Sequence, residues 1–171
     1  LAGNTLEFSV GFYHAEKVRP VVPGMSEPKV PSLPGFYSTT VASTVAWAKF
    51  WRNSAAVDFS GSTDSRAKQI EERVILSRYL MAVQMAGDVP PQESGLTCNT
   101  WYGKHHTEMI WWHTAHFALW GNDALLAKNL EWFQCQLPAA RELAKERGLR
   151  GARWAKMTGP AGRAGPSVST D

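Results

Sequence analysis

Several features that would quickly suggest a function are missing from this sequence. No apolar run approaches the ~20 residues that a membrane-spanning helix needs. The metal-binding spacings HExxH and CxxC are also missing, and the nearest arrangement is His113 and His116 at i and i+3 with Glu108 close by. We therefore expect no membrane span, no bound metal and no other cofactor.

Charge and cysteine are both scarce. Charged residues make up only 19% of the chain, the net charge is +3, and the basic residues are scattered, so a nucleic-acid surface is not indicated. The two cysteines, Cys98 and Cys135, fit either a disulfide or two free thiols. With 171 residues and 44% hydrophobic residues, the chain is long and apolar enough for one domain with a core.

One stretch, residues 99–120, has an unusual composition. It holds four of the eight tryptophans and four of the five histidines, together with Lys104 and Glu108. Flat rings, imidazoles and a carboxylate suit the binding of a molecule that has both hydroxyl groups and apolar faces, and a sugar is such a molecule. Each residue taken singly could instead be a buried core residue with a hydrogen-bond partner.

The chain begins with segments that are not helical in pattern. Residues 4–13 alternate between polar and apolar and predict a single strand with Leu6, Phe8 and Val10 on one face. Residues 14–37 carry five prolines and read as a linker or surface loop.

The rest of the chain predicts helices, with apolar residues spaced at three and four. Ser38 or Thr39 is the expected cap of the first helix. The first two helices, joined by a short loop, should form an antiparallel hairpin. Pro138 should kink or divide the last helix. The predicted helices are 40–56, 64–86, 104–119 and 124–147.

Two long loops contain the remaining candidate residues for binding. Residues 87–103 precede the third helix, and residues 148–171 follow the fourth and contain Trp154. Loops that follow helical hairpins can lie at the same end of a helical array, so the two could line one opening. Glu93 is a second carboxylate near this site, although a helix cap or a solvated charge fits it slightly better. The predicted substrate-binding residues are Trp101, Lys104, His106, Trp112, His113, Arg153 and Lys156, and the candidate catalytic residue is Glu108.

Two segments resemble the (α/α)6-barrel glycosidases, also called six-hairpin glycosidases. They are GLTCNTWYGKHHTEMIWWHTAHFALWG and LPAARELAKERGLRGARWAKMTGPAGR. A more distant similarity is to the maltose and trehalose phosphorylases, in which a Trp-Asp-Thr-Glu run corresponds to the region of Thr107 and Glu108. The resemblance covers about 38–165 and implies an all-α fold, in which helical hairpins form part of an (α/α)6 toroid.

The resemblance also implies a domain organisation. Residues 1–13 would be the end of a preceding β-sandwich domain, 14–37 a linker and 38–171 part of the catalytic domain. Leu1 at the start and the Gly- and Pro-rich end of the chain are expected of a piece cut from a longer protein. The four predicted helices are too few for a whole barrel, and the general acid of the family lies in a later hairpin. A periplasmic or extracellular location is implied by the resemblance alone.

The function that follows is a glycoside hydrolase acting on an oligo- or polysaccharide, with this chain supplying part of the sugar pocket. His106 stands where the phosphorylases have Asp, so phosphate-dependent cleavage is not expected. Glu108 would then be a catalytic or a supporting carboxylate. The alternative is a non-catalytic carbohydrate-binding or scaffold helical domain.

Overall fold

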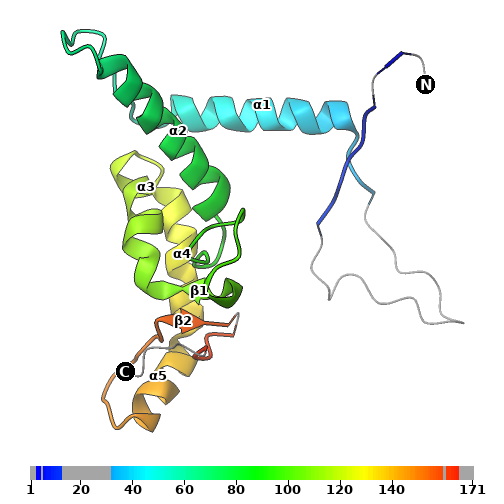
Figure 1. The fold of residues 1–171 in the computed structure, drawn as a ribbon. Helices are drawn as coiled ribbons and strands as arrows, with labels where there is room; N and C mark the ends of the chain where they lie inside the picture. Colours follow the sequence, from blue (N-terminus) through cyan, green and yellow to red (C-terminus); the bar gives the residue numbers. More distant parts are fainter. Residues whose placement is uncertain (1–2, 5, 13–31, 160, 166–171) are drawn as a thin grey trace, which may run out of the picture. The chain divides into compact units, whose positions relative to one another are not determined.

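The computed structural model describes residues 3–4, 6–12, 32–159 and 161–165 (Figure 1). It divides into two compact units, Leu1–Arg52 and Asn53–Asp171, which we call unit 1 and unit 2. Helices dominate the described residues, which confirms the mostly-α prediction. No helix among these residues is long and apolar enough to cross a membrane.

Unit 1 contains one helix, α1 (Phe36–Arg52). It begins four residues before the predicted start, and the predicted caps lie inside its first turn, where the Ser38 hydroxyl donates to the Gly35 carbonyl at 2.8 Å. The strand predicted for residues 4–13 is not formed by the described residues 6–12. A single strand has no neighbour to take its backbone hydrogen bonds, so alternation alone does not produce a sheet.

Unit 2 begins with a turn and the helix α2 (Ala67–Met85), close to the predicted 64–86. The pairing of the first two helices as a hairpin stays a prediction, because α1 and α2 belong to different units. The arrangement of the helical hairpins as part of an (α/α)6 toroid also stays a prediction. Arg78 of α2 is buried and donates to the Ala55 carbonyl and to the Ser54 hydroxyl, which attaches the preceding turn to the helix.

The third predicted helix, 104–119, is wrong in its first half. The chain instead makes a tight turn at Trp101–Gly103, a short strand β1 (His105–His106) and a 3-10 turn at Thr107–Met109. A π-helical turn at Trp111–Ala115 and the short helix α3 (His116–Leu119) follow. The reason is tertiary: β1 pairs antiparallel with β2 (Met157–Thr158), and this pairing replaces helical hydrogen bonds at the two histidines.

The division at Pro138 is confirmed. α4 (Asp123–Cys135) ends before Gln136, and α5 (Leu137–Glu146) carries Pro138 in its first turn. Proline is tolerated there because a backbone N–H in the first turn has no acceptor within the helix.

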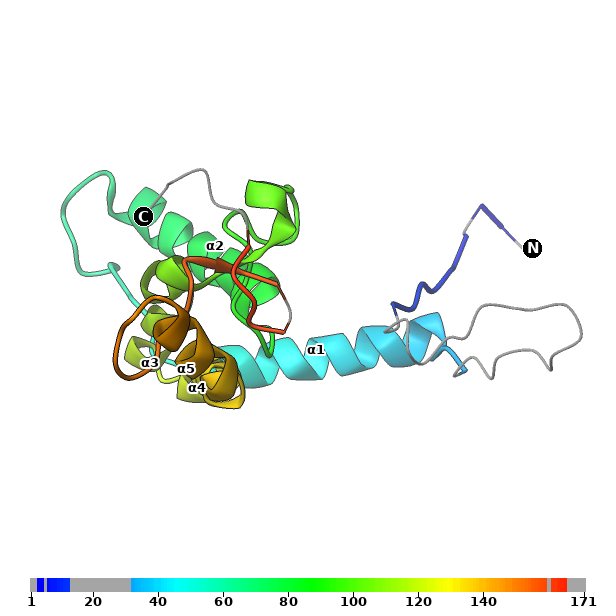
Figure 2. The ribbon, with the colours of Figure 1, turned by 90° about the horizontal axis from the view of Figure 1, so that it is seen from below.

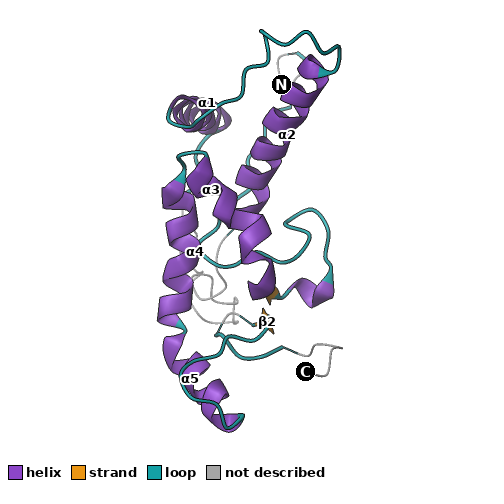
Figure 3. Ribbon diagram, turned by 90° about the vertical axis from the view of Figure 1, so that its left-hand side faces the viewer, coloured by secondary structure: helices purple, strands orange, loops and turns teal. Residues whose placement is uncertain are grey.

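The buried hydrophobic residues of unit 2 come from α2, α3, α4, α5 and β2. Figures 1 and 3 show α3 beside α4, and Figure 2 shows these helices from below together with α5. The Asn129 amide donates to the Gly87 carbonyl at 2.8 Å, so the end of α2 is fastened to α4. The buried hydrophobic residues are Met85, Phe117, Trp132, Ala140, Ala144 and Met157.

Candidate functional site

The two long loops of unit 2 are joined at the β1–β2 pair. The His106 amide donates to the Pro91 carbonyl at 3.0 Å, and the Thr107 amide donates to the Lys156 carbonyl at 2.9 Å. The Thr107 hydroxyl adds a 2.6 Å bond to the Ala155 carbonyl. Because Thr107 is buried and its donors are satisfied by the second loop, it fixes Lys156 next to the residues that follow β1.

Four side chains gather at this junction, and we call them the Glu108 cluster: Trp101, His106, Glu108 and Lys156. The Glu108 Oε1 atom lies 3.1 Å from His106 Nε2 and 3.2 Å from Lys156 Nζ. The Lys156 ammonium lies 5.4 Å from the centre of the Trp101 ring, within cation–π range. Trp101 meets the His106 ring edge-on, with 6.2 Å between ring centres.

The side chains of the Glu108 cluster differ in how deeply they are buried. The side chains of Glu108 and Lys156 are 45% and 37% exposed, whereas the His106 side chain is 1% exposed. The carboxylate and the ammonium can therefore meet a ligand at the surface. His106 lies behind them, and its ring nitrogen orients the Glu108 carboxylate.

Glu108 is kept ionised by its neighbours. Partial burial raises the pKa of Glu108, but hydrogen bonds and charges from His106 and Lys156 outweigh that effect and hold the pKa below its usual value. A carboxylate in this state can accept hydrogen bonds from hydroxyl groups or act as a base, but it is poorly suited to donate a proton.

A second carboxylate, Glu93, stands on the other side of the His106 ring. Its Oε2 atom is 3.9 Å from His106 Nδ1, and both atoms are buried without a hydrogen-bond partner. From the sequence, a cap or a solvated charge fitted Glu93 slightly better. Nothing in the PPQESG segment indicates which histidine its carboxylate approaches.

His113 lies next to this pair on the π-helical turn. It is buried, and burial lowers the pKa of His113, although its hydrogen bond to the Glu93 backbone opposes the change. Its neutral ring therefore packs behind the cluster. Direct contact with a sugar, which the sequence analysis expected of His106 and His113, would need exposed ring surface that neither presents.

A left-handed turn presents the aromatic side of the site. Trp101 and Tyr102 have φ angles of 48° and 62°, and Gly103 follows with 63°. Bulky residues rarely adopt this conformation, which costs of order 1–3 kcal/mol each and is often found at functional sites. The turn is closed by a 3.0 Å bond from the Gly103 amide to the Thr100 carbonyl, and both aromatic rings are exposed.

The other predicted residues are placed differently. Lys104 is half-buried and its aliphatic chain lies against Gly165, where an added Cβ would clash with Lys104 Cδ. Trp112 is exposed on the π-helical turn. Arg153 is half-buried, and its amide donates to the Ala140 carbonyl of α5 at 2.8 Å. The structure thus brings together Trp101, His106, Glu108 and Lys156, with His113 behind them.

Metal-binding side chains do not gather at one place in the part of the chain that the structure describes. No group of three or more His, Cys, Asp or Glu side chains there could hold a metal ion. Cys98 and Cys135 are both exposed and free, so the disulfide alternative is not realised.

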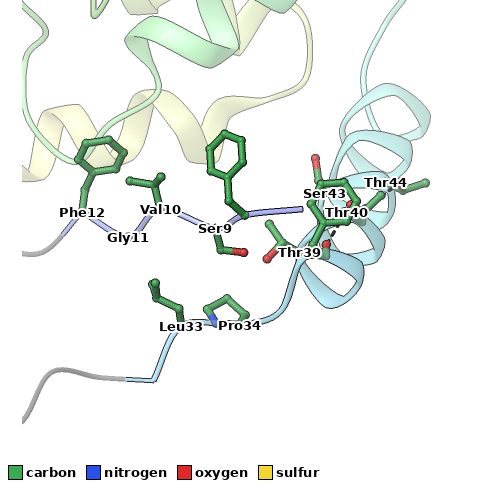
Figure 4. A pocket seen from close by; sticks show the side chains of 12 residues that line it. Ser9, Val10, Gly11, Phe12, Leu33, Pro34, Thr39, Thr40, Ser43 and Thr44 are labelled. Atoms are coloured by element: carbon green, nitrogen blue, oxygen red, sulfur yellow. Dashed lines mark hydrogen bonds between the residues drawn. The ribbon is translucent and has the colours of Figure 1, made fainter. Parts of the chain in front are cut away.

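Among the described residues, cavities also lie outside the cluster. Unit 1 has one of about 590 Å³ lined by residues 8–12, 33–34 and the start of α1, with the hydroxyls of Thr39, Thr40, Ser43 and Thr44 along one side (Figure 4). A second, of about 550 Å³, lies between α2 and the side chains of His116 and Trp120. A third, of about 450 Å³, is lined by the loop that follows α2 and by His105.

Comparison with known protein-family models, curated proteins and solved structures finds no match to this chain. The resemblance to six-hairpin glycosidases therefore stays a prediction that rests on the residues quoted for it.

Proposed function

We propose that this chain forms one wall of a carbohydrate site in a glycoside hydrolase that acts on an oligo- or polysaccharide. The observation that carries the proposal is the Glu108 cluster, in which an exposed aromatic ring, an ammonium and an ionised carboxylate lie side by side. Aromatic rings stack on the C–H faces of sugars, and charged groups form strong hydrogen bonds with hydroxyls.

The roles of the residues follow from their depth. Trp101 is the stacking surface, and Glu108 and Lys156 are the hydroxyl-binding groups. His106 orients Glu108 from behind, with Glu93 and His113 supporting the ring. Lys104, Trp112 and Arg153 stay candidates for contacts with a longer substrate.

The ionised state of Glu108 bears on catalysis. Glycoside hydrolysis needs a protonated carboxyl group as well as an ionised one. Glu108 fits the ionised member or a supporting group, and the proton donor would come from another part of the enzyme. The same observation favours the second candidate function, a helical domain that binds carbohydrate without cleaving it.

Calorimetric titration with maltotriose, cellotriose, xylotriose and mannotriose tests the proposal. We expect at least one trisaccharide to bind, and Trp101→Ala and Glu108→Gln each to weaken binding about tenfold, since one hot-spot contact contributes more than about 1.4 kcal/mol. Trp111→Ala is the matched control, because Trp111 is an exposed tryptophan outside the cluster. Binding that is absent, or unaffected by the two cluster variants, would contradict the proposal.

A further inference from the structure

The cavity behind the left-handed turn has a composition that the proposed function does not use. Its volume of about 450 Å³ falls in the range of roughly 300–1,000 Å³ that is typical of small-molecule sites. Three side-chain amides line it, those of Gln84, Gln92 and Asn99, together with His105 and the apolar walls of the PP segment. Its lining contains no aspartate, glutamate, lysine or arginine.

The strand β1 connects this cavity with the Glu108 cluster. Successive residues of a strand point to opposite faces. His106 accordingly faces Glu108 and Trp101, whereas its neighbour His105 lines the cavity and meets Trp132 edge-on with 6.0 Å between ring centres. The two sites are thus separated by a single strand and share the turn that ends at Gly103.

The polar atoms of the cavity lining have defined donor and acceptor roles. The Gln92 Nε2 atom donates to the Gly95 and Cys98 carbonyls, which leaves Gln92 Oε1 buried and without a partner. The His105 Nδ1 atom lies 2.8 Å from the Pro90 carbonyl, which can only accept, so Nδ1 carries the hydrogen and a neutral ring offers Nε2 as an acceptor.

Acceptor atoms in a cavity without ionic side chains suit a ligand that is neutral and rich in hydroxyl groups. Each hydroxyl can donate to His105 Nε2 or to a side-chain oxygen of Gln84 or Asn99, and can accept from an amide NH₂ group. A ligand carboxylate would find no cation in this lining to offset its desolvation. The apolar walls of Val89, Pro90 and Pro91 can cover the C–H face of a ring.

We propose that this cavity is a second sugar subsite, selective for a neutral pyranose ring, on the opposite side of β1 from the Glu108 cluster. The inference deepens the proposed function and rests on it for the class of ligand. An oligosaccharide would then contact both faces of the strand region, with one ring against Trp101 and another among the amides.

Side-chain NMR signals can test the two sites separately. Glucose, galactose, mannose and xylose are each titrated into the full chain, and the NH₂ signals of Gln92 and Asn99 report on the cavity while the Trp101 indole N–H reports on the cluster. We expect at least one neutral sugar to shift the amide signals, and glucuronate to bind there about tenfold more weakly than glucose, owing to the uncompensated charge.

Variants separate binding from loop structure. Asn99→Ala should remove most of the response of the Gln92 amide, and Val89→Trp, which fills the cavity, should abolish it. Gln134→Ala, an exposed amide on α4 away from the cavity, is the matched control.

The outcomes distinguish this inference from the proposed function. Shifts confined to the Trp101 indole, glucuronate binding as tightly as glucose, or an Asn99→Ala response equal to that of the control would each overturn the second subsite while leaving the cluster as a sugar site. Shifts confined to the amides would support the cavity and count against the cluster. No shift with any of the four sugars would overturn the second subsite, whereas the trisaccharide titration decides the cluster separately.

Discussion

Units 1 and 2 are stabilised by different kinds of interaction. No side chain of the helix α1 of unit 1 is fully buried, although Trp47, Phe50 and Trp51 are half-buried and their rings meet edge-on. The hydroxyls of Thr40 and Thr44 bond to carbonyls of the same helix. In unit 2, by contrast, Phe117, Trp132 and Met157 are almost fully buried and connect segments far apart in sequence. The first half of α1 therefore depends mainly on local propensity, whereas unit 2 depends on packing between its elements.

The largest expected effect comes from truncating the core of unit 2. Phe117→Ala should lower the free energy of unfolding by about 3–5 kcal/mol, because it removes a buried ring and leaves a cavity. The matched change on α1, Val45→Ala at an exposed position, should change it by less than about 0.5 kcal/mol. Urea unfolding followed by far-ultraviolet circular dichroism measures both. Equal losses in the two variants would show that α1 is held by packing after all.

A pair of threonines offers a smaller and more selective comparison. Thr44 on α1 and Thr114 in unit 2 both donate to the carbonyl four residues earlier, at 2.9 and 3.0 Å, but only Thr114 is buried. Thr114→Ala should cost about 1–2 kcal/mol through the lost hydrogen bond and methyl contact. Thr44→Ala should stabilise α1 by roughly a few tenths of a kcal/mol, since alanine is the better helix former.

Amide hydrogen exchange measures the Thr44 effect in α1 and the Thr114 effect in the π-helical turn and in α4, which packs against it. Thr114→Ser, which keeps the hydroxyl, is the control and should recover part of the loss. The contrast between the units would be contradicted if both alanine variants changed exchange in the same direction.

The same contrast explains what could be predicted from the sequence. The apolar spacing located α2, α4 and α5, and Pro138 marked the division between the last two, because these features depend on local chemistry. The strand over residues 4–13 and the helical reading of His105 and His106 were wrong, because pairing depends on a partner. Nothing near the two histidines in sequence indicates that they pair with Met157 and Thr158.

Of the candidate site, composition predicted the residues better than their roles. The mixture of rings and charges in both long loops pointed to Trp101, Glu108 and Lys156, which the structure brings into contact. The burial of His106 could not be predicted, because it follows from the hydrogen bond to Pro91 and the pairing of β1. The left-handed turn could not be predicted either, since tryptophan and tyrosine seldom adopt positive φ angles.

Lowering the pH should reduce the stability of unit 2 and leave that of α1 in unit 1 unchanged. Burial lowers the pKa of both His113 and His116 below the usual value of 6.5, although hydrogen bonds to the Glu93 and His113 backbones oppose the change. Between the lowered pKa and 6.5 the unfolded chain binds more protons than the folded one. The stability of unit 2 is therefore full above pH 6.5 and falls as the pH drops below it, by at most about 1.4 kcal/mol per pH unit for each histidine.

The helix α1 is the internal control for this pH effect, because its sequence contains no histidine, aspartate or glutamate. Amide exchange at pH 7 and pH 5, corrected for the intrinsic effect of pH, should show faster opening in α3 and α4 and no change in α1. Replacing both histidines by Gln should flatten the response of unit 2. If α1 loses protection in parallel with α4, the two units open together, and the difference in how they are stabilised does not make them independent.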